Sequence, residues 1–172
     1  MKYHSNLLDA EVYPQEELVF FYGGCLSQWA DGIFYCHSLD ETVNCAEQAM
    51  MLHKAKMFGD AETYNKIMRA RHPSTQKALG KIVKGFDEEK WSTIKFECVK
   101  NINIDKFTSA PEWKELLFLT HPYELVEASP SDRIWGIGMD IDNPDLLNQF
   151  KWGMNLLGKA LTMARDELMN KL

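Results

Sequence analysis

The chain has 172 residues, of which 45% are apolar and 26% are charged, so it can bury a substantial core without disulfides or a metal. This composition excludes a disordered chain, a collagen-like fibre and a small disulfide scaffold. The formal net charge of −6 gives no general attraction to nucleic acid or anionic membranes, so any phosphate must be held by a few local cations in a pocket.

No run of the sequence approaches the roughly 18 to 20 apolar residues that span a bilayer. The N-terminal segment carries Asp9 and Glu11 and lacks the apolar core of a signal peptide, so we expect a cytoplasmic protein without a membrane partner. The cysteines form no C-x-x-C pair and no zinc-type spacing, which predicts free thiols in or near the core and no metal site. They are Cys25, Cys36, Cys45 and Cys98.

The first third of the chain reads as strand and turn. Leu18–Tyr22 and Gly32–Cys36 are short apolar runs bounded by glycine or loop residues, and both predict short buried strands. Ser38-Leu39-Asp40-Glu41 has the spacing of a capping box, because the serine precedes the glutamate by three residues. This motif predicts a helix that runs to about Phe58, where Gly59 stops it.

The remainder is mostly helical. Aspartate and proline residues at helix-start positions, together with the apolar spacing, predict a series of helices. These helices run from Asp60 to about Ala70, Pro73 to about Gly85, Glu88 to about Phe107, Pro111 to about Leu119 and Gly153 to about Leu168. Leu125–Ala128 predicts a short strand, and Ile134–Gly138 predicts a strand or an extended loop. Because strands and helices do not alternate regularly, we expect a single mostly helical α+β domain over residues 1–172, with a few short strands.

The helix predicted after Ser38 breaks its own amphipathic pattern. Glu47 and Lys54 fall within its apolar stripe and lie about two turns, or roughly 10 Å, apart. In one interpretation both side chains reach water from the end of the stripe, or pair as structural ions. In the other, the stripe lines a cleft, and burial shifts the pKa values of a carboxylate and an amine that perform chemistry. The apolar members of the stripe are Val43, Met50, Met51, Met57 and Phe58.

A second informative segment is Ala128–Gly138, where Ser, Pro, Asp and Arg precede a tryptophan between Ile and Gly. Arg133 is the best phosphate ligand in the chain, since a guanidinium binds an anion through two parallel hydrogen bonds. Trp135 can stack on a base or sugar, and Gly136 lets the backbone approach a ligand closely. The alternative is a capped turn with an Asp132–Arg133 surface contact and a core tryptophan.

The last helix offers a third segment, Asn155-Leu156-Leu157-Gly158. Asn155 can cap this helix or reach into a cleft. Gly158 within a helix costs about 1 kcal/mol relative to alanine, which predicts that another part of the chain packs closely against it.

Together these segments resemble the NADAR family, also called YbiA-like. The matching stretches are Cys25-Leu26-Ser27-Gln28-Trp29, Glu47-Gln48 followed by Lys54-Ala55, Phe58-Gly59-Asp60, Ala128 to Gly138, and Asn155-Leu156-Leu157-Gly158. The resemblance covers about residues 18–170, and the S-P-S-D-R-I-W-G-I-G stretch is its most specific part. Gln28 stands where the family usually has Asn, Cys25 where an aromatic residue is common, and Gln48 where His is frequent.

The resemblance implies a compact, mainly helical α+β fold and an N-glycosidase that acts on ribosylated compounds, with no cofactor and no metal. Family members resemble enzymes that cleave ribosylamino-pyrimidine phosphates of the riboflavin pathway, and others resemble hydrolases that remove ADP-ribose from guanine bases. The implied partners are therefore a small ribosylated molecule or ADP-ribosylated guanine in a nucleotide or nucleic acid.

In that reaction we expect Glu47 to stabilise the positive charge that develops on the sugar and to activate water. Lys54 either delivers a proton or attacks C1 of an opened sugar as a neutral amine. Asp132 serves as a second carboxylate or orients Arg133, and the sequence does not separate these roles.

We expect the remaining predicted site residues to bind the substrate. Arg133 holds phosphate, Trp29 and Trp135 stack on base or ribose, and the other predicted contacts come from Ser27, Gln28, Gly136 and Asn155, of which Asn155 binds sugar hydroxyls. Two other classes remain open at this point, a non-catalytic module that binds ADP-ribose or a nucleotide and a scaffold protein with an apolar interface.

Overall fold

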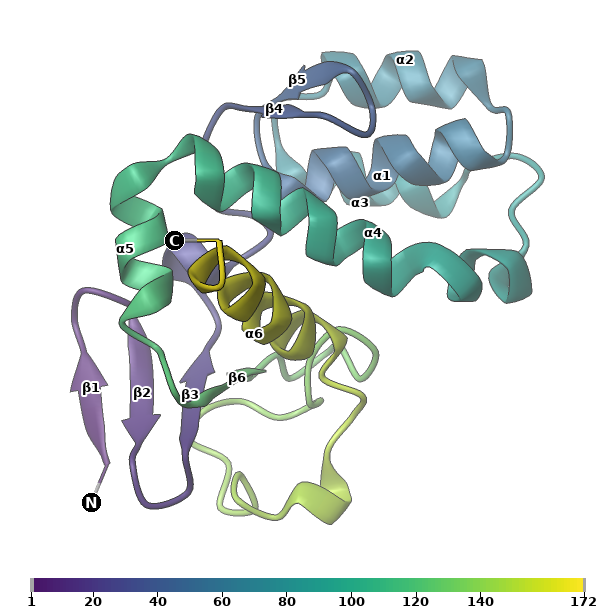
Figure 1. Ribbon diagram of the computed structural model, residues 1–172. Helices are drawn as coiled ribbons and strands as arrows, with labels where there is room; N and C mark the ends of the chain where they lie inside the picture. Colours follow the sequence, from purple (N-terminus) through teal and green to yellow (C-terminus); the bar gives the residue numbers. More distant parts are fainter. Residues whose placement is uncertain (1, 172) are drawn as a thin grey trace. The chain divides into compact units, whose positions relative to one another are not determined.

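The computed structural model describes residues 2–171, and its contacts divide the chain into two compact units (Figure 1). Unit 1 contains the residues up to Ser27 and those from Pro111 onward, and unit 2 contains Gln28–Ala110. The α+β class with a predominance of helix is confirmed. The assignment of one domain to the whole chain stays a prediction.

Unit 1 is built on a small mixed sheet with the strand order β1-β2-β3-β6. The first strands form an antiparallel meander, whereas β3 pairs in parallel with β6, with Phe20 opposite Val126. All residues of β3 are buried, as expected for a central strand that is covered on both faces. The strands are β1 (Tyr3–Ser5), β2 (Ala10–Tyr13), β3 (Leu18–Phe21) and β6 (Glu124–Glu127).

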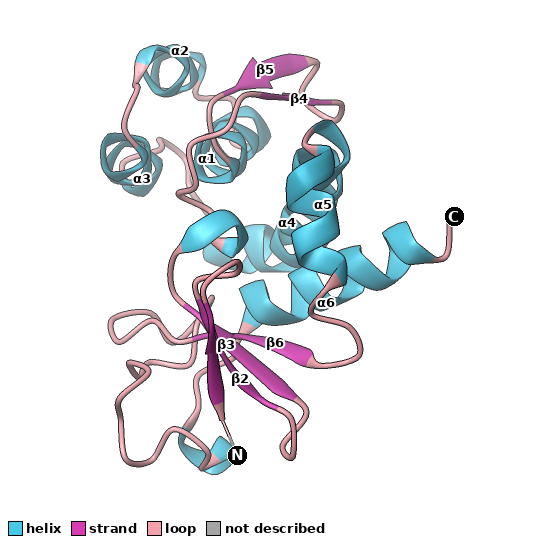
Figure 2. Ribbon diagram, turned by 90° about the vertical axis from the view of Figure 1, so that its left-hand side faces the viewer, coloured by secondary structure: helices cyan, strands magenta, loops and turns pink. Residues whose placement is uncertain are grey.

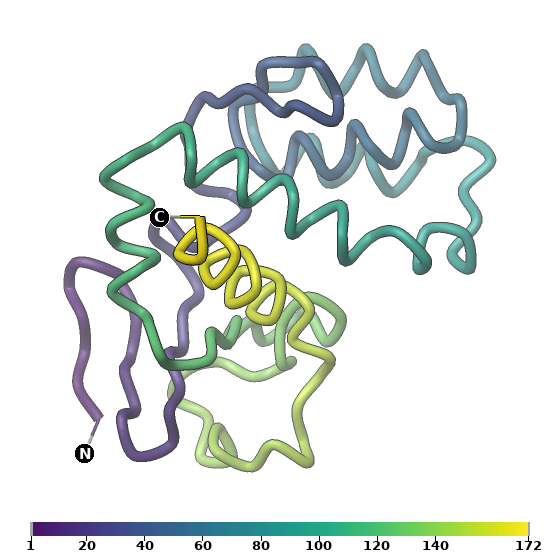
Figure 3. The backbone as a smooth tube through the Cα atoms, in the orientation of Figure 1, coloured from purple at the N-terminus to yellow at the C-terminus, as the bar shows by residue number. Residues whose placement is uncertain are grey.

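One face of this sheet packs against the loops that follow β6. Phe20 meets the ring of Trp152 edge-to-face at a centroid distance of 5.7 Å, and the indole nitrogen of Trp152 donates to the Leu146 carbonyl oxygen at 2.7 Å. Figure 3 shows this segment as a succession of loops before the last helix. The shared core contains Leu18, Phe20, Val126, Ala128, Ile137, Met139 and Leu146.

The helices of unit 1 are α5 (Pro111–Phe118) and α6 (Leu156–Met169), with short 3-10 turns at Gly24–Leu26 (η1) and Gln149–Lys151 (η2). Helix α6 runs along β6 (Figure 2). A Cβ on Gly158 would lie 2.0 Å from the carbonyl oxygen of Leu125 in β6. The predicted close packing against Gly158 is therefore confirmed.

Unit 2 is mostly helical. Figure 2 looks roughly along the axes of α1, α2 and α3, which pack side by side. The side chains of Asp60 and Asp87 accept hydrogen bonds from the first turns of α2 and α4, so both predicted caps are confirmed. The elements are β4 (Phe34–Cys36), β5 (Glu41–Val43), α1 (Ala46–Met57), α2 (Ala61–Arg69), α3 (Pro73–Lys81) and α4 (Glu88–Ser109).

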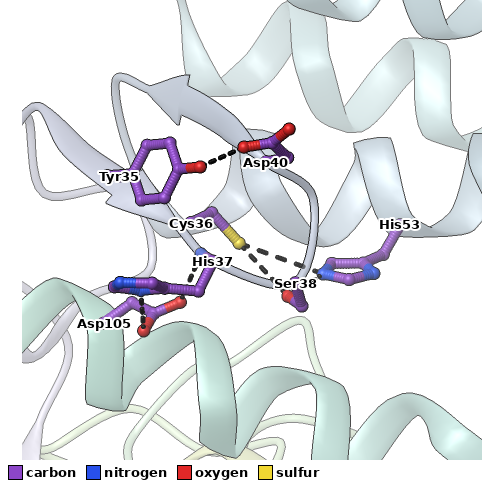
Figure 4. Close-up of polar contacts among 7 residues, drawn as sticks. All are labelled: Tyr35, Cys36, His37, Ser38, Asp40, His53 and Asp105. Carbon is purple, nitrogen blue, oxygen red and sulfur yellow. Dashed lines mark hydrogen bonds and ion pairs between the residues drawn. The ribbon is translucent and has the colours of Figure 1, made fainter.

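The capping box at Ser38 is a wrong prediction, because α1 begins only at Ala46 and Cys45 is its N-cap. The Ser38–Asp40 stretch is the turn between β4 and β5, which pair antiparallel. The Ser38 hydroxyl lies 2.8 Å from Nε2 of His53 in α1, and the Asp40 carboxylate accepts from the Tyr35 hydroxyl; Figure 4 draws these side chains. Both polar groups are thus used in side-chain contacts that hold the hairpin turn.

Three other differences concern irregular or short elements. Ile134–Gly138 forms a bent, irregular loop, so the strand alternative is wrong and the loop alternative holds. Helix α6 begins at Leu156 rather than Gly153. Strands β1 and β2 were absent from the predicted elements, because their short sequences alternate polar and apolar residues over too few positions to form a clear pattern.

Candidate active site

The carboxylate of Glu47 lies in the first turn of α1 and the residue is only 3% exposed. Two hydrogen bonds from backbone amides hold this turn in place. The amide of Gln48 donates to Cys45 Sγ at 3.4 Å, and the amide of Glu47 donates to the Gln28 carbonyl oxygen at 3.0 Å. The positive end of the helix dipole favours an acidic side chain at this position. This burial excludes, for Glu47, the interpretation in which the side chain reaches water from the end of the apolar stripe.

Lys54 lies two turns further along α1 and is half-buried. Its Nζ atom sits 3.8 Å from the centroid of the Phe86 ring. Burial lowers the pKa of Lys54, and the charges of Glu88 and Glu47 partly oppose this effect. The amine is therefore more readily neutral than that of a surface lysine, which suits both predicted roles.

Further buried polar side chains lie in unit 2 with Glu47. The Oε1 atom of Gln28 accepts from Nδ2 of Asn103 in α4 at 3.1 Å, and the same Nδ2 donates to the Val99 carbonyl oxygen at 2.8 Å. Within residues 2–171, Gln28 Nε2 and Asn103 Oδ1 are buried without a hydrogen-bond partner. Leaving such groups unpaired costs about 1–3 kcal/mol each, so they are normally satisfied by a ligand or water. The role of Gln28 in substrate binding stays a prediction.

Lys106 of α4 is 2% exposed, and its Nζ atom lies 5.1 Å from the centroid of the Phe107 ring. The charges of Glu47 and Lys106 both act on the Cys45 thiol, which places this lysine near the start of α1. Burial raises the pKa of Cys45 to about 11, and its Sγ atom donates to Gln76 Oε1, so this thiol is a structural group rather than a nucleophile.

Trp29 is 45% exposed, and Lys77 Nζ lies 5.9 Å from the centroid of its ring. An indole presented in this way can stack on a planar group. In unit 1, the amide of Ser27 donates to the Gly24 carbonyl oxygen at 3.2 Å and closes the η1 turn, which leaves its half-buried side chain at the end of that turn.

The loop after β6 in unit 1 is organised by Asp132. Its Oδ1 atom accepts from the amides of Ile134 at 2.9 Å and Trp135 at 2.8 Å, which is an Asx turn. Trp135 is half-buried in this arrangement. The structure therefore gives Asp132 a positioning role for the loop, and its predicted catalytic role stays a prediction.

The exposed Arg133 is anchored by the loop before α6. Its Nη2 atom donates to the carbonyl oxygens of Lys151 at 3.0 Å and Trp152 at 3.3 Å. A guanidinium has five N–H donors, so donors remain for a phosphate. A Cβ on Gly136 would lie 2.9 Å from the Glu127 carbonyl oxygen, so the close approach at this glycine is made by the chain itself.

Asn155 precedes α6 in the left-handed region, at φ 50°, and is 2% exposed. Its Oδ1 atom accepts from the Glu127 amide and its Nδ2 atom donates to the Leu125 carbonyl oxygen, each at 3.0 Å. Asn155 occupies the N-cap position of α6, but among the described residues its side chain makes no capping hydrogen bond, so it does not cap the helix through its amide. The amide joins the start of α6 to β6, and its contact with sugar hydroxyls stays a prediction.

Comparison with known proteins agrees with the resemblance seen in the sequence. The model of the NADAR domain matches residues 20–169. The chain belongs to the NADAR family. This NADAR chain is 37% identical over 164 residues to the N-glycosidase R617 of Acanthamoeba polyphaga mimivirus, which covers 88% of the chain and 96% of the relative. It is 30% identical over 150 residues to the N-glycosidase Npun_R5314 of Nostoc punctiforme, covering 87% of the chain and 88% of the relative.

Two other matches extend the comparison. The NADAR chain is 26% identical over 165 residues to the riboflavin biosynthesis protein VVA0006 of Vibrio vulnificus, covering 96% of the chain and 42% of that relative. The solution structure of Escherichia coli YbiA matches with a TM-score of 0.72 at 23% identity, over 90% of this chain and 86% of that one. The YbiA-like fold is thereby confirmed. As a relative of curated N-glycosidases, the NADAR protein is a hydrolase that acts on N-glycosyl compounds.

Two buried polar residues of the NADAR chain, Asn103 and Lys106, were not among the predicted site residues. Their spacing of three along α4 places them on one helix face, but charged and apolar residues alternate along that helix and mask the face in the sequence.

In residues 2–171 the cysteines are free and no cluster of three or more His, Cys, Asp or Glu could hold a metal ion. No helix in that range is long and apolar enough to cross a membrane.

Proposed function

We propose that the chain hydrolyses the N-glycosidic bond between a ribose and an amine or base, the ribose belonging to ADP-ribose or ribose 5-phosphate. ADP-ribosylated guanine, in a nucleotide or nucleic acid, and ribosylamino-pyrimidine intermediates of riboflavin synthesis are substrates of this kind. The similarity to a riboflavin biosynthesis protein of Vibrio vulnificus supports the ribosylamino-pyrimidine intermediates as substrates. The cytoplasmic location expected from the sequence belongs to the same proposal.

The observation that carries the proposal is the burial of Glu47, an acid 3% exposed at the start of α1, with a half-buried lysine two turns further along. When the bond between C1 and nitrogen breaks, positive charge develops on C1 and the ring oxygen. A carboxylate in a water-poor environment stabilises that charge more strongly than one in bulk solvent. Glu47 is the group on α1 that is suited to this task.

Hydrolysis of the C1–N bond consumes water as its only co-reactant. The electrons of the C1–N bond leave with the nitrogen, which takes up a proton from the ammonium of Lys54 or from solvent. Water attacks C1, and Glu47 accepts its proton. In the alternative route, neutral Lys54 attacks C1 of the opened sugar, releases the amine as a Schiff base forms, and is regenerated when water hydrolyses the imine.

Replacement of Glu47 by the isosteric glutamine tests the proposal. We expect Glu47→Gln to reduce hydrolysis of ADP-ribosylated guanosine, or of a ribosylaminopyrimidine phosphate, by at least about a hundredfold. Circular dichroism should show an unchanged fold, and mass spectrometry of the released base and sugar provides the assay. Glu112→Gln is the matched control, because Glu112 is an exposed acid in the first turn of α5.

Near-normal turnover by Glu47→Gln would remove this residue from the mechanism. If the wild type binds these substrates but releases no free base from either, the proposed substrate class is wrong.

A further inference from the structure

Unit 2 contains a cavity of about 390 Å³ beside the start of α1. This volume lies within the range of roughly 300–1,000 Å³ that small-molecule sites occupy. One wall is formed by the loop before β4 together with the segment that leads into α1, and the other wall is formed by the turn between α2 and α3. The lining residues are Trp29, Asp31, Asn44, Cys45, Arg71, His72 and Pro73.

Buried amide side chains hold the two walls together. Gln76, which is fully buried, donates through Nε2 to Asn44 Oδ1 at 2.9 Å and to the Ala70 carbonyl oxygen at 2.8 Å. Asn44 Nδ2 donates in turn to the Arg71 carbonyl oxygen at 3.0 Å, and Gln48 Nε2 lies 3.4 Å from the Ala70 carbonyl oxygen. Since these bonds fix the backbone of the turn, the cavity is preorganised rather than a product of loop mobility.

The fixed backbone presents charged side chains that the fold does not use. Within the described part of the chain, the exposed side chains of Arg71 and Asp31 make no hydrogen bond or ion pair. Helix α3 begins at this wall, and its N-cap residue His72 makes no side-chain capping bond there. An unpaired guanidinium beside the positive end of a helix favours an anion, and phosphate is the anion that a guanidinium binds bidentately.

The opposite wall offers a planar surface. The indole of Trp29 is 45% exposed at the cavity, with the Lys77 ammonium 5.9 Å from its centroid. An exposed tryptophan stacks on any nucleobase, because every base has a π-face. Asp31 adds a carboxylate, the group that accepts hydrogen bonds from ribose hydroxyls in many nucleotide sites.

A second cavity of unit 2, of about 430 Å³, lacks this combination. Of its acidic lining groups, Asp60 accepts from the amides of Thr63 and Lys84, and Glu41 accepts from the Tyr64 hydroxyl. Its lining includes neither an arginine nor a tryptophan. Of these two cavities, the one lined by Trp29, Asp31 and Arg71, called the Trp29–Arg71 cavity below, is the one equipped for a nucleotide.

We propose that the Trp29–Arg71 cavity binds a nucleoside 5′-phosphate, with the base on Trp29, the phosphate on Arg71 and the ribose hydroxyls on Asp31. Resting on the proposed function, we further assign this cavity to the nucleotide end of an ADP-ribose-type substrate, the end that is remote from the cleaved bond. This assignment favours ADP-ribosylated compounds over ribose 5-phosphate derivatives, since the latter carry no second nucleoside.

Calorimetric titration of the whole chain with AMP tests the proposal without turnover. We expect AMP to bind the wild type, and Arg71→Ala to weaken its binding at least about tenfold through loss of the bidentate phosphate contact. Arg69→Ala is the matched control: it removes the same charge two residues away from an exposed site that does not line the cavity. The affinity of Arg69→Ala for AMP should stay within about twofold of the wild type, because an exposed charge that makes no direct contact with the ligand is weakened by solvent and salt.

Ribose 5-phosphate is the second probe, since it keeps the phosphate and the sugar but lacks the base. The loss of stacking should weaken its binding at least about fivefold relative to AMP. Three results would overturn the proposal: no binding of AMP by the wild type at millimolar concentration, equal weakening by Arg71→Ala and Arg69→Ala, or equal affinity for AMP and ribose 5-phosphate. Because hydrolysis is not measured, these outcomes are independent of the Glu47→Gln result.

Discussion

Replacement of Gly158 by alanine probes the contact between α6 and β6 in unit 1. The added Cβ would lie 2.0 Å from the Leu125 carbonyl oxygen, and 2.5 Å from Oδ1 of Asn155. Ordinary van der Waals contact begins at 3.4 Å, so the helix and the strand must separate by about 1.4 Å. The nearest atom belongs to the backbone, which cannot turn away as the end of a flexible side chain can.

The expected loss of stability combines opposing terms. Alanine gains about 1 kcal/mol over glycine from helix propensity. Overpacking costs about 1–3 kcal/mol. The shift also strains the hydrogen bonds of Asn155 to Leu125 and Glu127, at about 1 kcal/mol each. The net effect is a loss of about 2–4 kcal/mol in the free energy of unfolding.

Urea denaturation followed by circular dichroism measures this loss as a lower midpoint with an unchanged slope. The propensity contribution is measured in the same helix by comparing Met163→Ala with Met163→Gly, because Met163 is 47% exposed. A Gly158→Ala variant as stable as the wild type, or about 1 kcal/mol more stable, would show that propensity alone acts here and would refute the packing argument.

Lys54, His53 and Asn155 each provide a further test. Because burial lowers the pKa of Lys54, its amine is available as a nucleophile at pH values where a surface lysine is mostly protonated. At such a pH, borohydride should trap an adduct between the wild-type protein and the substrate, and Lys54→Met should give none. A wild type that yields no adduct rules out the Schiff-base route. Burial lowers the pKa of His53 from 6.5 to about 4, so its neutral form stabilises the fold fully above pH 6.5, and this contribution is lost as the pH falls toward 4. After discounting for partial exposure, the loss should be about 1–2 kcal/mol by urea titration at several pH values, and His53→Gln should flatten it; an equal slope in both proteins would contradict the assignment. Asn155→Ala should lower the free energy of unfolding by about 2–3 kcal/mol, because two buried hydrogen bonds disappear and alanine is strained at a φ of 50°. Asn155→Gly should lower it less, since glycine adopts this conformation without strain. If the glycine variant were the less stable of the two, left-handed strain would be excluded as a cause.

The helices of unit 2 after residue 59 were predictable because their signals are local. Asp60 and Asp87 cap the first turns that follow them, and Pro73 starts α3, so a few neighbouring residues determine each start. The capping box at Ser38 is equally local but wrong. The Ser38 hydroxyl contacts His53, which is 15 residues away, and this tertiary contact is absent from the motif itself.

The candidate site was only partly predictable for the same reason. Glu47 could be found because an acid within an apolar stripe is anomalous on its own helix. Asn103 could not, since its significance depends on Gln28, which is 75 residues away in the sequence. The residues of the Trp29–Arg71 cavity likewise come from separate segments, and Arg71 in isolation resembles any surface arginine.

The parallel pairing of β3 with β6 has a consequence for biosynthesis. Leu18 lies opposite Glu124, so the central strand of unit 1 emerges from the ribosome long before its neighbour is made. All of unit 2 is synthesised in the interval. During that time the Leu-Val-Phe-Phe strand has an unpaired edge and an incomplete apolar covering, which is the kind of nascent segment that chaperones protect. Unit 2 is one continuous stretch of chain, whereas unit 1 is complete only after its C-terminal helix has been synthesised.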